Sequence, residues 1–428
     1  MPKSSLLVLM AVLISASGCR TLEYRAMRTG HATPLPRPAA MISVDAEGNA
    51  TAAVSIDDAG LSALRRTPRG QMKLHFINVG QGAATLVEFP GDCGAVLIDA
   101  GSGPGHSDSL AMYLESFFGN NRPDLDYTVQ TLFLTHPHQD HLAALASIGL
   151  PASRSPEFLV VRNVVDDGQY DMDAAPSFSR LQGKLKDSVS SARHKAVIFD
   201  RRPQNGGYTN AVIDAVECAG VDPEIRVLWG GSRDESAWPT KSAFNNPNNH
   251  SLVIRIDYGE SSVLITGDLM DDGIAQLLAA YADQPELLDI DIYVPGHHGA
   301  ENGTNAEFLD AMSPVMAVIQ VGDPTDGAGG PSAWGHGHPN LSTLRLLKQS
   351  VACGRSGRRY ALAMDQQESD IFIESNNCQI YATGWNGNVV VNAFPDGRTQ
   401  VEVQCDNLPG NWDDSARVQA FHECVGSQ

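Results

Sequence analysis

Side chains of metal-ligating type are concentrated in one short segment of this sequence, Thr135-His136-Pro137-His138-Gln139-Asp140-His141. The apolar run 131–135 leads directly into the segment and predicts a buried strand that ends there. Ligands on the loop that follows a strand can converge on one point at a sheet edge. Imidazole and carboxylate are donors that suit zinc, manganese and iron. The segment therefore predicts a metal site supported by a sheet.

Two later segments repeat this arrangement of an apolar strand followed by ligand-type side chains. Leu264-Ile265-Thr266 runs into Gly267-Asp268, which predicts a carboxylate at a sheet edge where it could bridge two ions. Gly-Asp is also a common turn, so this signal is weak by itself. Val294-Pro295-Gly296-His297-His298-Gly299 places a histidine pair after another strand. Together the three segments supply enough ligands for two metal ions.

The net charge of −20 over 428 residues opposes broad electrostatic binding of nucleic acid. Basic side chains are concentrated only between about residues 150 and 245, at Lys184, Lys186, Arg193, His194, Lys195, Arg201 and Arg202. If they line the site, DNA is favoured as substrate; if they face outward, a small phosphoester is favoured. A solvated helix face is an equally good interpretation.

The N-terminal segment 1–19 predicts an export signal. Lys3 precedes the apolar run 6–14, and small residues then lead to Cys19. This pattern predicts a bacterial lipoprotein whose lipidated Cys19 anchors it to the cell envelope, on its periplasmic or extracellular face. The alternative is a plain secretory signal and a secreted protein. Residues 20–71 predict a tether with a short hairpin around 45–49.

Six cysteines follow Cys19, an even number that permits disulfides in an exported protein. Their positions favour two local pairs, Cys353–Cys378 and Cys405–Cys424. Short strands in two groups, with helices between them, predict an α/β sandwich of two sheets. We expect residues 72–350 to form the domain that carries the candidate metal site, with an insert at about 150–245, and the strand-rich segment 351–428 to complete it.

The spacing His136-x-His138-x-Asp140-His141, followed by Asp268 and His297-His298, resembles the metallo-β-lactamase superfamily. The sequence is most similar to the extracellular hydrolase domain of ComEC-type competence proteins. That similarity is carried in order by Asn78-Val79-Gly80-Gln81-Gly82, Leu97-Ile98-Asp99-Ala100-Gly101, Asn248-Asn249-His250-Ser251-Leu252-Val253, Gly296-His297-His298-Gly299, Trp334-Gly335-His336-Gly337-His338-Pro339 and Thr383-Gly384-Trp385-Asn386-Gly387-Asn388-Val389-Val390-Val391. The resemblance implies a four-layer αββα sandwich with a strand-rich C-terminal extension.

Two features depart from this branch. Ala83 stands where an acidic residue is usual, and Asn78 replaces an aspartate that is common there. The insert at about 150–245 is longer than the branch leads us to expect, and we expect it to form a cap over the site.

The resemblance also implies roles for the candidate residues. His136 and His138 would hold one divalent ion, Asp140 and His141 the other, and Asp268 would bridge them. His297 or His298 would complete the second site, and Asn248, Asn249 or His250 would fill the remaining position. Ligation by His250 would favour zinc, which we expect; without it manganese becomes a rival. Asp140, Asp268 and His336 are the expected catalytic residues, and Asp99, Asn249 and His338 are expected to support the ligands.

These inferences favour an exported metal-dependent phosphodiesterase or nuclease that attacks a phosphoester or nucleic acid with a hydroxide activated by two metal ions. One alternative is a hydrolase of another ester, a lactone or an amide, because folds host many chemistries. An alternative of another class is a non-catalytic envelope binding protein with a structural metal site. The sequence indicates no protein partner.

Overall fold

The computed structural model describes residues 41–44, 50–53, 70–150, 159–170, 176–199, 206–323, 334–355, 359–365, 370–405 and 415–426. The predicted signal segment with Cys19, and most of the predicted tether, lie outside the described residues. Within the tether, β1 (Met41–Val44) pairs antiparallel with β2 (Ala50–Ala53). The short hairpin predicted there is therefore confirmed.

An eight-stranded mixed sheet carries one part of the predicted metal site, and its strand order is β18-β17-β3-β4-β5-β6-β7-β8. Its strands are β3 (Met72–Phe76), β4 (Thr85–Glu88), β5 (Ala95–Ile98), β6 (Thr128–Leu134), β7 (Val160–Asp166), β8 (His194–Ala196), β17 (Val389–Ala393) and β18 (Thr399–Val403). Strands β5 to β8 pair in parallel and the others antiparallel. The carboxyl ends of β5 and β6 therefore meet at one edge, which brings Asp99 beside the histidine cluster.

A six-stranded mixed sheet with the order β16-β13-β12-β11-β10-β9 carries the other part of that site. Its strands are β9 (Glu224–Trp229), β10 (Val253–Tyr258), β11 (Ser261–Ile265), β12 (Ile292–Val294), β13 (Met316–Ile319) and β16 (Ile380–Ala382). Strands β11, β12, β13 and β16 pair in parallel. Asp268 and the His297-His298 pair follow β11 and β12, so they leave the sheet at the same edge.

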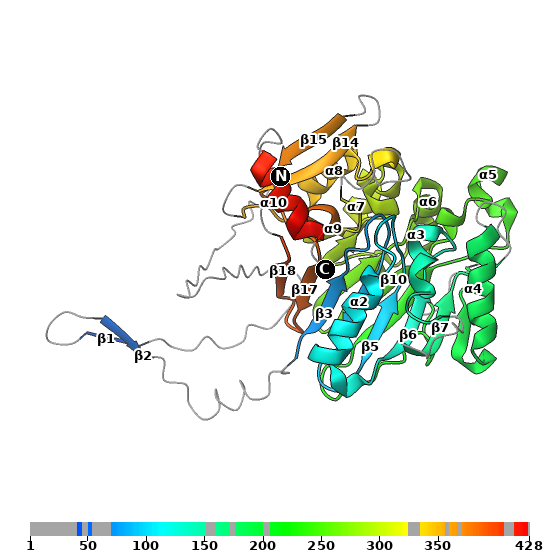
Figure 1. The fold of residues 1–428 in the computed structure, drawn as a ribbon, viewed down its shortest axis with the longest axis horizontal. Coiled ribbons are helices and arrows are strands. Elements are labelled where there is room, and N and C mark those ends of the chain that lie inside the picture. Colours follow the sequence, from blue (N-terminus) through cyan, green and yellow to red (C-terminus); the bar gives the residue numbers. More distant parts are fainter. Residues whose placement is uncertain are drawn as a thin grey trace.

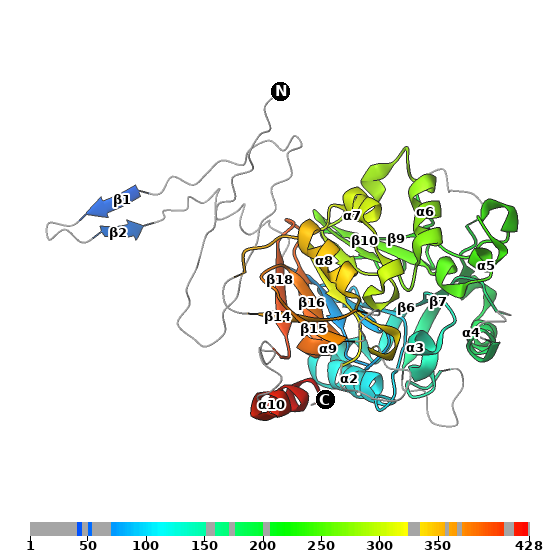
Figure 2. The same cartoon turned by 90° about the horizontal axis from the view of Figure 1, so that it is seen from above.

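Helices cover the outer face of each sheet, and Figure 2 shows the resulting layers. Against the eight-stranded sheet lie α2 (Ser109–Ser116), α3 (Gln139–Leu142) and α4 (Pro176–Ser188). Against the six-stranded sheet lie α6 (Asp271–Ala280), α7 (Ala306–Met312) and α8 (Leu341–Ser350). A third apolar core fills the space between the sheets. The expected αββα layering is confirmed.

Strand β5 shows why the layers form. Val96 and Ile98 point into the core between the sheets, whereas Ala95 and Leu97 point to the core beneath the helices. All four side chains are buried. A strand that is covered on both faces has no polar alternation, so its continuous apolar run is the expected signature.

The C-terminal segment contributes to both sheets: β16, labelled in Figure 2, extends one, and β17 with β18, labelled in Figure 1, extends the other. The remaining elements are the hairpin β14 (Tyr360–Asp365) and β15 (Asp370–Ser375), the one-turn helices α5 (Lys241–Phe244) and α9 (Thr383–Asn386), and α10 (Ser415–Gly426). The strand-rich C-terminal extension is confirmed. No helix in the described part of the chain has the length and apolar character needed to cross a membrane.

The six cysteines form three disulfides. Cys353–Cys378 and Cys405–Cys424 confirm the predicted local pairs, and Cys93–Cys218 joins residues 125 positions apart. The last pair ties the turn between β4 and β5 to the segment that precedes β9.

Removal of the long-range disulfide is expected to destabilise the protein more than removal of a local one. A cross-link restricts the unfolded chain more as the closed loop lengthens. For separations of 125 and 19 residues, the difference is roughly 1–2 kcal/mol of unfolding free energy. Urea denaturation of the paired serine variants of Cys93–Cys218 and Cys405–Cys424 measures it. Equal losses would contradict the argument.

Asp167, just after β7, is a buried carboxyl group that we expect to be neutral. Its Oδ1 accepts from Gln182 Nε2 at 2.6 Å, while its Oδ2 and Gln182 Oε1 are both buried without a hydrogen-bond partner. Burial, reinforced by the neighbouring Asp166 carboxylate, raises the pKa of Asp167 well above its ordinary value. A proton on Oδ2 would pair with Gln182 Oε1 and satisfy both atoms.

Asp167→Asn is therefore expected to stabilise the fold as the pH rises. The folded-state pKa lies above the unfolded one, so the wild type loses stability as the pH rises toward the folded value. The asparagine amide can donate to Gln182 Oε1 at every pH. We expect the advantage of the variant to grow by about 1–3 kcal/mol as the pH rises from about 4, the ordinary pKa of aspartate, toward the folded pKa, measured by urea denaturation between about pH 4 and pH 9. An advantage that shrinks with rising pH would contradict this.

The neighbouring substitution Asp166→Asn is the matched control. Asp166 accepts hydrogen bonds from Tyr170 Oη at 2.9 Å and from Gly168 N at 3.0 Å, and it forms an ion pair with His194. Loss of a charge that has these partners is expected to destabilise the protein.

Candidate metal centre

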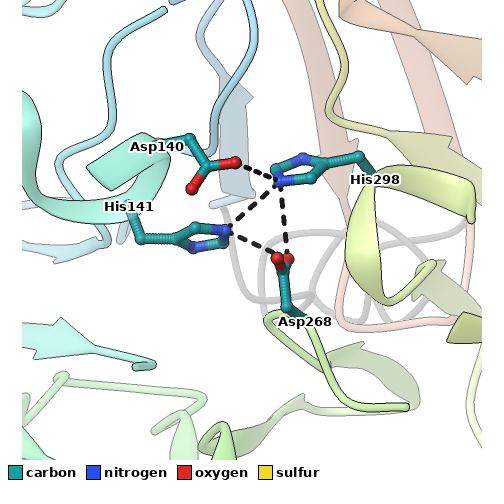
Figure 3. Close-up of side chains that lie close together, drawn as sticks. All are labelled: Asp140, His141, Asp268 and His298. Atoms are coloured by element: carbon teal, nitrogen blue, oxygen red, sulfur yellow. Dashed lines mark hydrogen bonds and ion pairs between the residues drawn. The ribbon is translucent and has the colours of Figure 1, made fainter. Parts of the chain in front are cut away.

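The loops after β6, β11 and β12 bring Asp140, His141, Asp268 and His298 together at one edge of the sandwich (Figure 3). Asp140 and His141 lie in the single helical turn of α3, which begins after His138. Asp268 and His298 approach from the opposite sheet. One potential ligand atom from each of the four residues lies within 4.8 Å of the others.

The four side chains point their donor atoms toward a common centre. His298 Nε2 lies 3.1 Å from Asp140 Oδ2 and 3.5 Å from Asp268 Oδ1. His141 Nε2 lies 3.0 Å from Asp268 Oδ1 and 3.4 Å from His298 Nε2. Two imidazoles and two carboxylates with converging lone pairs form a donor set that suits a divalent ion.

A second group, His136, His138 and Asp268, adjoins the first and shares Asp268 with it. Asp268 Oδ2 lies 3.6 Å from His136 Nε2, while Oδ1 faces the first group. His136 is fully buried, and its Nε2 has no hydrogen-bond partner. A buried polar atom without a partner is costly, and a metal ion would remove that cost. The residues therefore fit two divalent ions with Asp268 between them.

Asp99 orients a member of the first group. Its Oδ2 accepts from His141 Nδ1 at 2.7 Å, and its Oδ1 accepts from the Thr135 backbone N–H at 2.8 Å. With its hydrogen on Nδ1, the His141 ring presents the lone pair of Nε2 to the centre. Asp99 has a positive φ of 59°, a rare conformation for a residue other than glycine.

Backbone hydrogen bonds from two earlier segments, around Ala83 and Ala100, hold the His136–His141 segment in place. Ala83 N donates to Asp140 O at 2.9 Å, and Ala100 N donates to His141 O at 2.8 Å. A Cβ on Gly101 would collide with Asp140 O and with Ala83. This close backbone approach is the reason for glycine at position 101.

Burial and neighbouring charges shift the pKa values of the histidines and aspartates in these two groups. Burial lowers the pKa of His136 well below its ordinary value. Burial also disfavours charge on His141 and His298, but carboxylates outweigh it and raise both pKa values. Burial disfavours ionisation of Asp140 and Asp268, but the imidazoles outweigh it and lower both pKa values. Without metal, protons on the imidazoles compensate the buried carboxylates.

His297 and His298 both have a positive φ, 51° and 54°. This turn sends His298 into the first group, whereas His297 faces the wall formed by Asn248 and Asn302. Of the pair, the structure therefore places His298, and not His297, among the ligands. Non-glycine residues in this conformation cost on the order of 1–3 kcal/mol each, and they concentrate at functional sites.

His250 lies outside both groups, and its assignment as a ligand is corrected. Its Nδ1 accepts from Ser232 N at 3.0 Å, and its Nε2 donates to Phe244 O. Both ring nitrogens are thus engaged and no lone pair remains for a metal ion. Asn248, two residues earlier, lines the cavity instead, and its Oδ1 is buried without a hydrogen-bond partner.

Three other residues predicted for the site, His336, His338 and Asn249, differ in exposure and in hydrogen bonding. His336 is exposed and lines the cavity, and His338 behind it is buried with Nδ1 unpartnered. Burial lowers the pKa of His338 well below its ordinary value. Asn249 serves the fold: its Oδ1 accepts from Gly273 N, at the start of α6, and its Nδ2 donates to Ala243 O.

Four members of the ligand groups, His138, Asp140, Asp268 and His298, line a cavity of about 630 Å³. Its lining residues are Gln81, His138, Asp140, Asn248, Asp268, Asp271, His297, His298, Ala300, Glu301, Asn302, His336 and His338. Sequence reasoning did not single out Asp271, Glu301 or Asn302 for the site, although all three follow within five residues of predicted ligands. That proximity was the available signal.

The insert at about 150–245 contributes β7, β8 and β9 to the edges of the two sheets. None of the cavity-lining residues comes from its described part. The expectation of a cap is therefore corrected for the residues that the structure describes. Lys186 instead forms an ion pair with Asp187, and Lys195 packs over the ring of Tyr208. Arg201 and Arg202 lie outside the described residues.

Comparisons with known proteins agree with this geometry. Residues 77–149 match the model of the metallo-beta-lactamase superfamily. The chain is 22% identical over 285 residues to ComE operon protein 3 of Bacillus subtilis (strain 168), which covers 65% of this chain and 30% of that protein. It is 32% identical over 118 residues to competence protein ComA of Neisseria gonorrhoeae, which covers 28% of this chain and 17% of that protein.

The chain thus spans less than a third of the length of these curated relatives. Among solved structures, unliganded yeast PDE1 aligns with a TM-score of 0.36 and 9% identity, over 77% of this chain and 100% of that one. The resemblance to the superfamily and to its competence-protein branch, predicted from the motifs, is confirmed.

Proposed function

We propose that this chain, whose residues 77–149 match the metallo-beta-lactamase superfamily model, is a metal-dependent phosphodiesterase that cleaves small phosphodiesters. The observation that carries the proposal is Asp268, whose two oxygens face two separate groups of ligands. A structural site has no need of a second ion or a bridging carboxylate, whereas hydrolytic two-metal sites use both.

Each residue has a defined part in this proposal. Asp140, His141 and His298 would hold one ion, and His136 and His138 the other. Two divalent ions would supply an acidified water molecule and would stabilise the negative charge on the phosphoryl oxygens. Asp268 would belong to both sites, because its two oxygens face the two groups.

The leaving oxygen needs a proton, and the exposed imidazole of His336 on the cavity wall is the group that we assign to supply it. The ring of His338 lies beside that of His336, with 6.0 Å between the ring centroids.

The size and charge of the cavity support a small substrate. Its volume of about 630 Å³ is typical of small-molecule sites. Among the described residues that line it there is no lysine or arginine, whereas the exposed carboxylates of Asp271 and Glu301 belong to the lining. A polyanion therefore gains no ion pair with a lysine or arginine among these lining residues. This supports a small phosphodiester over a long nucleic acid.

We also propose that the protein acts outside the cytoplasm. All six cysteines after Cys19 are paired in disulfides, which persist in oxidising compartments. This supports export, and membrane attachment through Cys19 belongs to the same proposal.

The test is hydrolysis of bis-p-nitrophenyl phosphate, p-nitrophenyl acetate, a lactone, and single- and double-stranded DNA by protein loaded with Zn²⁺ or Mn²⁺. We expect metal-dependent cleavage of the phosphodiester, with kcat/KM for DNA at least about tenfold lower, which corresponds to about 1.4 kcal/mol. Two bound ions without phosphodiester cleavage would overturn the proposal. Cleavage of only the acetate or the lactone would indicate another esterase, and efficient DNA cleavage would indicate a nuclease.

A further inference from the structure

Three side chains on the cavity wall, Asn302, His297 and Asn248, form a hydrogen-bonded row beside the ligand groups. His297 Nδ1 lies 2.9 Å from Asn302 Oδ1. An amide oxygen only accepts, so His297 carries its hydrogen on Nδ1 and keeps a lone pair on Nε2. That Nε2 lies 3.4 Å from Asn248 Nδ2 and accepts from it. Hydrogen-bond donation along the row thus runs from Asn248 through His297 to Asn302.

This direction sets the orientation of the Asn248 amide. Its Nδ2 faces His297 and also Met270 Sδ, at 3.4 Å. Its Oδ1 is left buried without a hydrogen-bond partner, in a side chain that is 5% exposed. An unpaired buried oxygen is unfavourable, and a ligand for that oxygen would offset this cost.

The backbone that follows Asn248 is tied to two of the ligand loops. Leu252 N donates to Thr135 O, immediately before His136, and Asp268 N donates to Ser251 Oγ. The Asn248 segment is thereby held between two of the ligand loops, and Asn248 lines the same cavity as His138. His297 is held too, because its N–H donates to Gly267 O at 3.1 Å.

We propose that His297 is a positioning residue that, oriented by Asn302, turns the Asn248 amide so that its Oδ1 completes the donor set of the ion at His136 and His138. The inference rests on the proposed metal-dependent function, and it explains why two adjacent histidines adopt the left-handed conformation. His298 supplies a ligand to one ion, and His297 orients a ligand to the other.

The experiment uses the full-length protein and needs no substrate. Long-range 15N NMR of the metal-free protein reports the tautomer of His297, and Zn²⁺ or Co²⁺ titration reports the affinity of each site. We expect the Nδ1–H tautomer in the wild type and in Asn302→Asp, whose carboxylate also accepts. In Asn302→Leu we expect mixed tautomers and about 10–100-fold weaker binding of one ion, with the other unchanged.

Glu301→Gln, at the adjacent cavity position, is the matched control and should leave tautomer and both affinities unchanged. The proposal is overturned by an Nε2–H tautomer in the wild type, or by wild-type binding of fewer than two ions. It is also overturned if Asn302→Leu binds both ions normally, or if His297→Ala weakens binding as much as His136→Ala, since His297 would then be a ligand. Two bound ions and the expected tautomer without phosphodiester cleavage would contradict only the proposed function.

Discussion

Asp268→Ala is expected to lower phosphodiester hydrolysis by at least about 1000-fold, the scale of losing a principal stabiliser of transition-state charge. Asp268 lies between the two ligand groups, 3.0 Å from His141 Nε2 and 3.6 Å from His136 Nε2. Its removal takes a ligand from both groups at once. It also leaves His141 with less negative charge nearby in the buried site.

The measurement is kcat/KM for bis-p-nitrophenyl phosphate together with the number of metal ions bound per chain. We expect the variant to bind fewer than two ions, with circular dichroism showing a retained fold. Asp271→Asn is the matched control, because this exposed carboxylate lines the same cavity but belongs to neither ligand group. A variant of Asp268 that keeps both ions and full activity would exclude a bridging role.

Metal affinity is expected to rise steeply with pH, by about tenfold per pH unit for each proton displaced. Burial disfavours charge on His141 and His298, but the carboxylates around them outweigh burial and raise both pKa values in the metal-free protein. Below those values each imidazole must lose a proton before it can bind an ion. Acid therefore favours the metal-free state, and affinity increases toward the raised pKa values.

Calorimetric titration with Zn²⁺ between about pH 6 and pH 8, in two buffers of different ionisation enthalpy, measures both the affinity and the protons released. Asp99→Asn provides the matched comparison. Its amide oxygen still accepts from His141 Nδ1, but the negative charge that helps to raise the pKa of His141 is gone. We expect a shallower pH dependence in this variant. Affinity that is independent of pH in the wild type would contradict the argument.

The fold class followed from the sequence because the signals are local. Apolar runs such as 95–98 are continuous where a strand is covered on both faces, and each ligand motif begins where such a run ends. The two short-range disulfides also followed from local spacing. Cys93–Cys218 could be reached only by elimination, since it joins segments that meet through the packing of distant strands.

The described part of the insert at about 150–245 does not form the expected cap over the site, and the reason is physical. A long insert between two strands can cover a site or continue the sheets, and its composition is compatible with both. Here β7 and β8 continue the parallel order of β6, and β9 pairs with β10. Backbone hydrogen bonds at the two sheet edges, which carry no pattern of their own in the sequence, decided between these outcomes.

The sequence alone was enough to predict the metal-binding chemistry and the sheet edge that carries it. His136, His138, Asp140 and His141 fall within one loop, so their proximity needs no knowledge of packing. Tertiary structure alone decided which distant donors join them. The left-handed turn at His297 and His298 selects the second imidazole, and packing against Ser232 and Phe244 occupies both nitrogens of His250 while Asn248 faces the cavity. These choices depend on backbone direction and on competing hydrogen bonds, which residue type and spacing do not specify.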